Sequence, residues 1–176
     1  CAGGVVHGYG GGGAVMNAWP AVPLSELVDP TRGITYGIVQ PGEHDRAGIP
    51  IIRVTDLKGD RVDTKNPMRV RPEIEGSYSR TRLRGGELIM SIVGTVGQTA
   101  IVDSSLVGWN VARAIAVIPV REEIGASWVR ICLRGGAALD HIASRLNTTV
   151  QATLNLRDLS NLPIQLPPVA VRNSIT

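Results

Sequence analysis

Four short apolar runs, each rich in β-branched residues, indicate the fold class of this 176-residue chain. They cover residues 48–57, 87–93, 98–102 and 113–120. Runs of this length and composition favour strands, and the Gly-Thr-Val-Gly sequence at 94–97 is typical of a tight connection between two of them. A Lys-Gly-Asp turn closes the first run after a proline near its start. We predict a strand-rich core with short links.

The later part of the sequence predicts helices. Apolar residues recur at helical spacing over residues 127–134 and again over 137–146, and two glycines at 135–136 separate the two periods. Residues 154–168 then predict a turn, a short apolar strand and a proline break. A run of strands followed by helices indicates an α+β domain with a few short helices.

The length allows one well-packed domain, because two would each have a thin core. Residues 1–18 include a run of four glycines, which would lose much backbone entropy on ordering. We therefore expect a flexible Gly-rich leader at 1–18 and an ordered domain that begins at Trp19.

The lack of recognisable targeting signals and the small number of cysteines both indicate a reducing compartment. No apolar stretch reaches the roughly 18 to 20 residues that cross a bilayer, and no signal peptide is evident, so we expect a cytoplasmic location. Of the two cysteines, Cys1 is the first residue and Cys132 lies in an apolar helical stretch. We expect no disulfide and an inert, buried Cys132 thiol.

Positive charge is concentrated in one part of the chain. The formal net charge is +3, but the window from Arg53 to Arg84 holds nine bases against five acids, so the remainder is slightly acidic. A local excess of this kind suits a surface that faces a polyanion. A solvated strand-and-loop face would explain the same charges.

Motifs for cofactors and metals are missing from the sequence. No glycine is followed by Lys and then Ser or Thr, so there is no P-loop, and the Gly-rich leader follows no strand, as a dinucleotide fingerprint would. His7, His44 and His141 are scattered without a second His or Cys at ligand spacing. We predict no cofactor and no metal site.

One catalytic alternative stays open. Asp56 and the Asp-Thr-Lys sequence at 63–65 have the residue types of a small Mg²⁺-dependent nuclease, in which two carboxylates hold the ion and a lysine positions water. Gly59 makes the segment look like a single turn rather than two adjacent strands, which such a core usually needs.

Arginines alternate with other residues at 69–71 and 80–84, so they would project to one side if the backbone is extended. Arginine forks onto phosphates and onto guanine edges, and Tyr78 with Ser77 could add backbone contacts. DNA binding is one interpretation, and a solubilising edge strand is the other.

Four collinear motifs resemble the target-recognition domain of type I restriction-modification specificity subunits. Residues 151–168 contain Asn-Leu-Arg-Asp-Leu followed by Leu-Pro-Ile-Gln-Leu-Pro-Pro, which is similar to the family's closing signature. Residues 48–59 resemble its early Ile-Arg-Val-x-Asp-Leu-x-Gly strand and turn. Residues 84–97 resemble its Gly-Asp-Leu-Leu-x-Ser-x-x-Gly-Thr-x-Gly centre, and residues 109–119 its Asn-x-x-Arg-Ala-x-Ala-x-Ile-x-Pro strand.

The resemblance implies a non-catalytic domain that docks on one half of a split duplex DNA target. Methyltransferase (modification) and restriction subunits of a type I system would be its partners, and a homodimer stays open. The implied domain covers residues 19–168, with residues 169–176 as the start of a conserved helical region that is cut short here. That last segment lacks the Glu-Gln usual at the start of this region.

We predict phosphate contacts from the region 69–84 and base contacts from nearby loops. The full set of predicted DNA-binding residues is Arg53, Lys58, Lys65, Arg69, Arg71, Tyr78, Arg80, Arg82, Arg84, Thr95, Asn110 and Arg113. Besides the nuclease, a protein-interaction module without DNA binding and a nonspecific nucleic-acid binder are alternatives.

Overall fold

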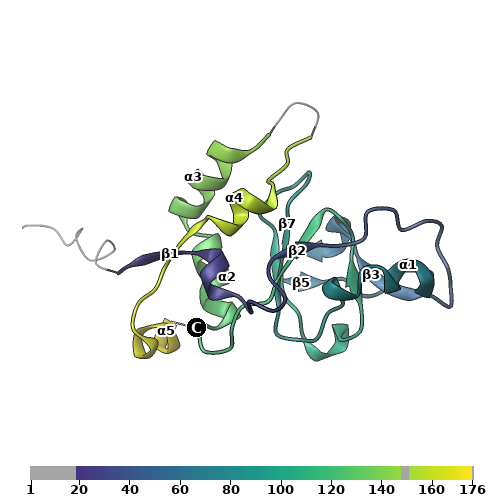
Figure 1. Ribbon diagram of the computed structural model, residues 1–176, viewed down its shortest axis with the longest axis horizontal. Coiled ribbons are helices and arrows are strands. Elements are labelled where there is room, and N and C mark those ends of the chain that lie inside the picture. The colour runs from purple at the N-terminus through teal and green to yellow at the C-terminus, as the bar shows by residue number, and fades with distance from the viewer. Residues whose placement is uncertain (1–18, 148–150, 176) are drawn as a thin grey trace, which may run out of the picture.

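The computed structural model describes residues 19–147 and 151–175, so the leader predicted at 1–18 lies outside the described residues. The described part is elongated (Figure 1). Four helices, α2 to α5, lie toward one end of its long axis, and α1 with the strand β3 lies toward the other. The α+β class predicted from the sequence is confirmed.

A four-stranded antiparallel sheet lies between these two ends. Its order is β2-β10-β7-β8, with the bounds Thr35–Tyr36, Ile115–Ile118, Leu88–Ser91 and Thr99–Ile101. The strands predicted at 87–93, 98–102 and 113–120 are therefore confirmed. Gly94 and Gly97 have φ of 79° and 97°, which suits glycine and lets the β7–β8 hairpin close tightly.

A smaller three-stranded sheet has the order β6-β3-β9, with the bounds Met68–Val70, Ile49–Ile52 and Asn110–Val111. The strand predicted over 48–57 is wrong in its second half. The chain leaves β3 at Arg53 and makes a 3-10 turn, η2 (Val54–Asp56), because the Asp56 carboxylate accepts hydrogen bonds from the Arg53 backbone N–H and guanidinium. A hairpin of β4 (Leu57–Lys58) and β5 (Arg61–Val62) follows, around the predicted turn.

Both faces of the central sheet are buried. On β7 and β10, Leu88, Met90 and Ile118 pack against the helical end of the molecule, whereas Ile89 and Val117 pack on the opposite side with residues such as Leu83 and Leu106. Side chains alternate between the faces of a strand, so every residue of these two strands is apolar or small and buried. The apolar runs in the sequence reflect this two-sided burial.

The helical end combines the chain from α2 onward with its first described strand. The helices α2 (Ala126–Leu133) and α3 (Gly136–Arg145) confirm the predicted helices, and α4 (Leu156–Ser160) occupies the predicted turn. The strand β11 (Pro163–Gln165) then pairs antiparallel with β1 (Ala21–Pro23). The 3-10 turn η1 (Leu24–Leu27) follows β1, and the helix α5 (Val169–Ile175) follows β11.

Aromatic and sulfur-containing side chains join these elements. The Trp128 indole Nε1–H donates to the Gln165 carbonyl at 2.9 Å, and its ring meets Trp19 edge-on at 6.5 Å between centroids. Burial raises the pKa of the Cys132 thiol to about 11, so the thiolate is scarce at neutral pH. No helix within 19–147 or 151–175 is long and apolar enough to cross a membrane.

Candidate nucleic-acid interface

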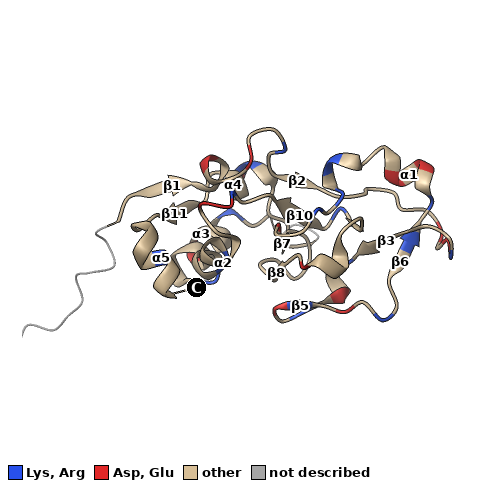
Figure 2. Ribbon diagram, turned by 90° about the horizontal axis from the view of Figure 1, so that it is seen from below, with Lys and Arg blue, Asp and Glu red and all other residues tan. Residues whose placement is uncertain are grey.

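The basic region 69–84 is less regular than the sequence predicts. Arg69 lies on the strand β6, but Pro72 begins the helix α1 (Pro72–Gly76), and Arg80 lies in the 3-10 turn η3 (Ser79–Thr81). An extended backbone, the condition under which the arginines at 80–84 would project to one side, is therefore not met. Figure 2 shows where the charged residues fall, with basic residues on β5 and β6 and acidic ones on α1.

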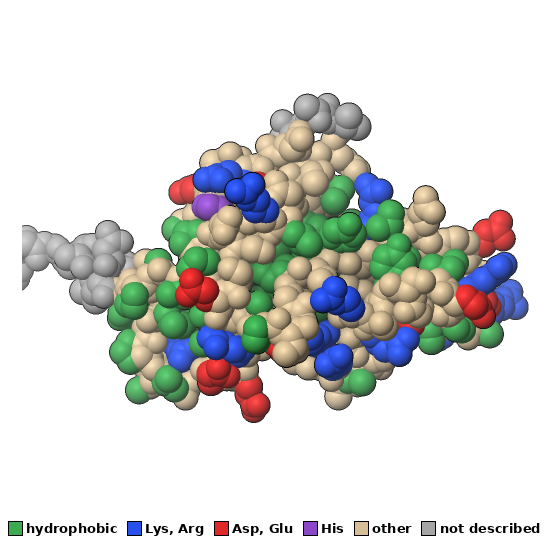
Figure 3. Space-filling view, viewed as in Figure 1, with side chains coloured by type: hydrophobic (Ala, Val, Ile, Leu, Met, Phe, Trp, Pro, Cys, Tyr) green, Lys and Arg blue, Asp and Glu red, His purple; other side chains and the backbone are tan. Residues whose placement is uncertain are grey.

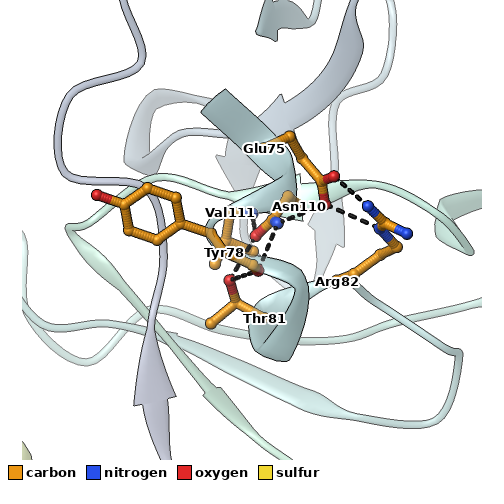
Figure 4. A network of polar contacts seen from close by, with 6 residues as sticks. All are labelled: Glu75, Tyr78, Thr81, Arg82, Asn110 and Val111. Carbon is orange, nitrogen blue, oxygen red and sulfur yellow. Dashed lines mark hydrogen bonds and ion pairs between the residues drawn. The ribbon is translucent and has the colours of Figure 1, made fainter. Parts of the chain in front are cut away.

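A buried polar network holds α1, η3 and β9 together (Figure 4). The Asn110 Nδ2 group donates to Glu75 Oε1 at 2.9 Å and to the Tyr78 carbonyl at 3.1 Å. Its Oδ1 accepts from the Thr81 hydroxyl at 2.7 Å and from the Val111 N–H at 2.8 Å. A single amide therefore links three segments, and its hydrogen-bonding groups are all used within the protein.

The prediction of Asn110 as a DNA-contacting residue is wrong for this conformation, because its side chain is fully buried. Tyr78 lies at the edge of the same network, to which it contributes its carbonyl. No sequence signal distinguished a buried asparagine from an exposed one. The burial follows from β9 being covered by α1 and η3, which depends on the tertiary fold.

Arg82 also has a structural partner. Its guanidinium forms a two-pronged ion pair with Glu75, whose side chain is only 1% exposed. The hydrogen bonds from Arg82 lower the pKa of the Glu75 carboxyl, and burial opposes this only in part. Removing Arg82 would leave a buried carboxylate without its charge partner, so Arg82 cannot be treated as a simple surface cation.

The remaining arginines of this segment line a shallow hollow, which we call the Arg80 hollow. It has a volume of about 370 Å³ and is lined by Ser79, Arg80, Arg82, Leu83 and Arg84. The side chains of Arg80 and Arg84 are exposed, and neither has an ion-pair partner among the described residues. Arg84 attracts the Asp29 carboxylate without forming a direct ion pair with it, and two guanidinium groups at a concave surface can hold phosphate oxygens.

A second cationic hollow lies at the other end of the same segment, and we call it the His44 hollow. It has a volume of about 600 Å³ and is lined by His44, Arg53, Lys65, Asn66, Pro67, Met68 and Arg69. Arg53, Lys65 and Arg69 were predicted as DNA-binding residues, and the fold brings them together. His44 was missed, because a lone histidine carries no sequence signal of its own.

Other predicted residues lie elsewhere on the surface. Lys58 is exposed on the β4–β5 hairpin, Arg71 precedes α1, and Thr95 is exposed at the tip of the β7–β8 hairpin. Arg113 lines a largely apolar hollow of about 390 Å³ together with Tyr36. In Figure 3 the basic side chains on the face shown form separate groups, not one continuous patch.

The arrangement of the acidic residues does not favour the nuclease alternative. Both Asp56 carboxylate oxygens accept hydrogen bonds from Arg53, at 2.8 to 3.0 Å, and Asp63 Oδ1 accepts from the Lys65 backbone N–H. Within the part of the chain that the structure describes, no group of three side chains could hold a metal ion.

Comparison with curated proteins finds a relative in Escherichia coli, the type I restriction enzyme EcoBI specificity subunit. It is 30% identical over 158 residues, which is 89% of this chain and 33% of that protein. The chain therefore spans about a third of the length of this relative. No protein-family model matches the sequence.

Solved structures show the same fold. One, from work on complex assembly and conformational transition of the type I R-M system, has a TM-score of 0.67 with 20% identity and covers 93% of this chain and 38% of that one. The HsdS subunit from Thermoanaerobacter tengcongensis has a TM-score of 0.63, with 21% identity over 93% of this chain and 37% of its own. The S subunit of a type I system from M. genitalium has a TM-score of 0.56, with 12% identity over 92% and 39%. The resemblance to type I specificity subunits is thus confirmed.

Proposed function

We propose that this chain is a DNA target-recognition module of a type I restriction-modification specificity subunit and that it binds one part of a duplex target by sequence. The observation that carries the proposal is the 30% identity over 158 residues to a specificity subunit, because it extends over nearly all of this chain. The cationic hollows give the physical means of binding, since phosphate contacts dominate the affinity of proteins for duplex DNA.

The proposed contacts follow the exposed cations. Arg80 and Arg84 would bind backbone phosphates, and the exposed Lys58 and Arg71 would add positive charge at other places on the surface. Thr95, on an exposed hairpin tip, is suited to enter a groove, as is Arg113 on the rim of its hollow. Phosphate contacts set position on the duplex, whereas contacts to base edges set sequence preference.

The proposal assigns recognition to this chain and bond-making to its partners. Residues 19–168 would form the recognition domain, and residues 169–176 would lead into a helical region. Methyltransferase and restriction subunits would supply the chemistry, as the relatives' names suggest for their own systems. A cytoplasmic location, where bacterial DNA is found, is part of the same proposal.

Selection from a pool of random duplexes tests the proposal. The purified protein is mixed with the pool, bound duplexes are recovered and amplified, and the product is sequenced after several rounds. We expect enrichment of one short motif, because base-edge contacts discriminate by about 1 to 3 kcal/mol for each base pair. Recovery of duplexes without a shared motif would indicate nonspecific binding, and no recovery at all would refute DNA binding.

A further inference from the structure

We propose that the His44 hollow is a phosphodiester-binding cleft, separate from the Arg80 hollow, and that it holds a backbone phosphate of the duplex. This inference rests on the proposed function and deepens it, because it assigns a second phosphate position and adds His44 to the binding residues. Five side chains with N–H donors line the hollow (His44, Arg53, Lys65, Asn66 and Arg69), and no carboxylate does so.

His44 presents one defined donor. Its Nδ1 accepts a hydrogen bond from the Arg69 backbone N–H at 3.3 Å, so the neutral ring carries its proton on Nε2. The segment before β3 is fixed against β6 by a second bond, from the Asp45 N–H to the Arg69 carbonyl at 3.0 Å. The backbone of β6 therefore sets both the position and the tautomer of this histidine, and it leaves Nε2–H for another acceptor.

Hydrogen bonds orient the Arg53 guanidinium, and one of its nitrogen groups is left to donate to a ligand. Its Nε and Nη2 groups donate to Asp56, and Nη2 also donates to the Asn66 carbonyl at 3.3 Å. These bonds leave the Nη1 group, and the side chain is 41% exposed. Asp56 compensates the Arg53 charge, so we assign Arg53 the role of a fixed hydrogen-bond donor.

The net positive charge comes from Arg69 and Lys65. Arg69 donates from Nη1 to the Gly48 carbonyl at 3.0 Å, which anchors the guanidinium but does not neutralise it. Lys65 is exposed and has no ion-pair partner among the described residues. Asp63 and Asp45, which are close to Lys65 and His44 in the chain, accept backbone hydrogen bonds, Asp63 Oδ1 from the Lys65 N–H and Asp45 Oδ1 from the Ala47 N–H.

These features fit a phosphodiester. It has a single charge and several acceptor oxygens, and it suits a site with two uncompensated cations and two preset N–H donors. The site also lies on the same stretch of chain as the Arg80 hollow, linked to it by β6, Arg71 and α1. A duplex that reaches both hollows would contact phosphates at two places, which would fix its orientation on the protein.

The test compares two variants that each lose one positive charge. Lys65→Ala removes a cation from the His44 hollow, and Arg157→Ala removes an exposed one from α4, at the helical end of the molecule. Binding of a selected duplex is measured by fluorescence anisotropy over a range of salt concentrations. We expect Lys65→Ala to bind about three to ten times more weakly and its log–log salt slope to be about 0.9 shallower, as loss of one phosphate contact predicts.

His44→Asn is a second variant, which replaces the imidazole by an amide. Asparagine Oδ1 can replace Nδ1 as the acceptor for the Arg69 N–H, while the outward donor is lost. We expect binding about two to five times weaker, a preserved sequence preference and an unchanged urea midpoint.

The outcomes separate this inference from the proposed function. If the wild-type protein binds a selected duplex but Lys65→Ala and Arg157→Ala have the same affinity and salt slope, the cleft is refuted and the function stands. If the wild-type protein binds no duplex, the function is refuted and the cleft with it. An altered sequence preference in His44→Asn would indicate a base contact and would also contradict the assignment.

Discussion

The buried polar residues Glu75 and Asn110 determine how several segments of this domain are positioned. Glu75 is almost fully buried, yet it is charged, because Arg82 and the Asn110 amide both donate to it. Such a carboxylate fixes the position of α1 and η3, and therefore of the Arg80 hollow that follows them. Sequence inspection could not have found this role, because Asn110 is 35 residues from Glu75 in the chain.

Replacement of Glu75 by glutamine should destabilise the protein in a pH-dependent way. The Glu75 pKa lies below its ordinary value of 4.5, so its ionised form stabilises the fold above that pH, and this contribution is lost as the pH falls through the lowered pKa. We expect Glu75→Gln to lower the free energy of unfolding by about 1 to 3 kcal/mol at neutral pH. Urea titrations should show this difference shrinking below about pH 4.5. A difference that stays constant down to acid pH would contradict this assignment.

At the scale of elements, the sequence predicted the strands and helices that are buried by apolar residues alone. The strands β7, β8 and β10 are almost wholly apolar, and in the helices α2 and α3 the apolar residues recur at helical spacing between polar ones. The prediction of one strand over 48–57 was wrong in its second half. The β-branched residues continue past Arg53, but there the Arg53 and Asp56 side chains bind each other and the strand ends. The local ion pair outweighed the strand propensity of these residues. Strand-propensity scales do not include such a side-chain interaction.

The turn η2 should depend on the Asp56 side chain. Asp56→Ala removes the acceptor for the Arg53 backbone N–H and guanidinium, so the chain between β3 and β4 loses its cap. We expect the free energy of unfolding to fall by about 0.5 to 2 kcal/mol, as for other caps. Asp140→Ala, an exposed position on α3, serves as the control and should change it by less than about 0.5 kcal/mol. An equal change in the free energy of unfolding for the two variants would show that the Asp56 side chain does not stabilise η2.

Over the whole molecule, positive charge is divided among separate hollows. The sequence located the basic window at residues 53–84, and this proved to include two of the hollows. It could not separate Arg82, which is bound to Glu75, from Arg80 and Arg84, because all three look alike in an alternating pattern. Only the fold distinguishes a cation with a buried partner from one that faces solvent.

This distinction predicts which arginine variants will be informative. The double variant Arg80→Ala/Arg84→Ala should weaken duplex binding about tenfold or more and make the log–log salt slope about 1.8 shallower, since two phosphate contacts would be lost. Its unfolding midpoint should stay close to that of the wild type. Arg82→Ala should instead lower the midpoint, because it leaves the Glu75 carboxylate buried without its partner. Full binding by a well-folded double variant would show that the Arg80 hollow does not contact DNA.

The pairing of β1 with β11 has one further consequence. Ala21 lies opposite Gln165 in the register, so the chain enters the central part of the fold and leaves it at neighbouring points. Everything between those points, including the four-stranded and three-stranded sheets, the β4–β5 hairpin and the cationic hollows, lies between these two adjacent strands. Because the two ends of this stretch are adjacent, changes of length within it need not alter the spacing of the chain on either side.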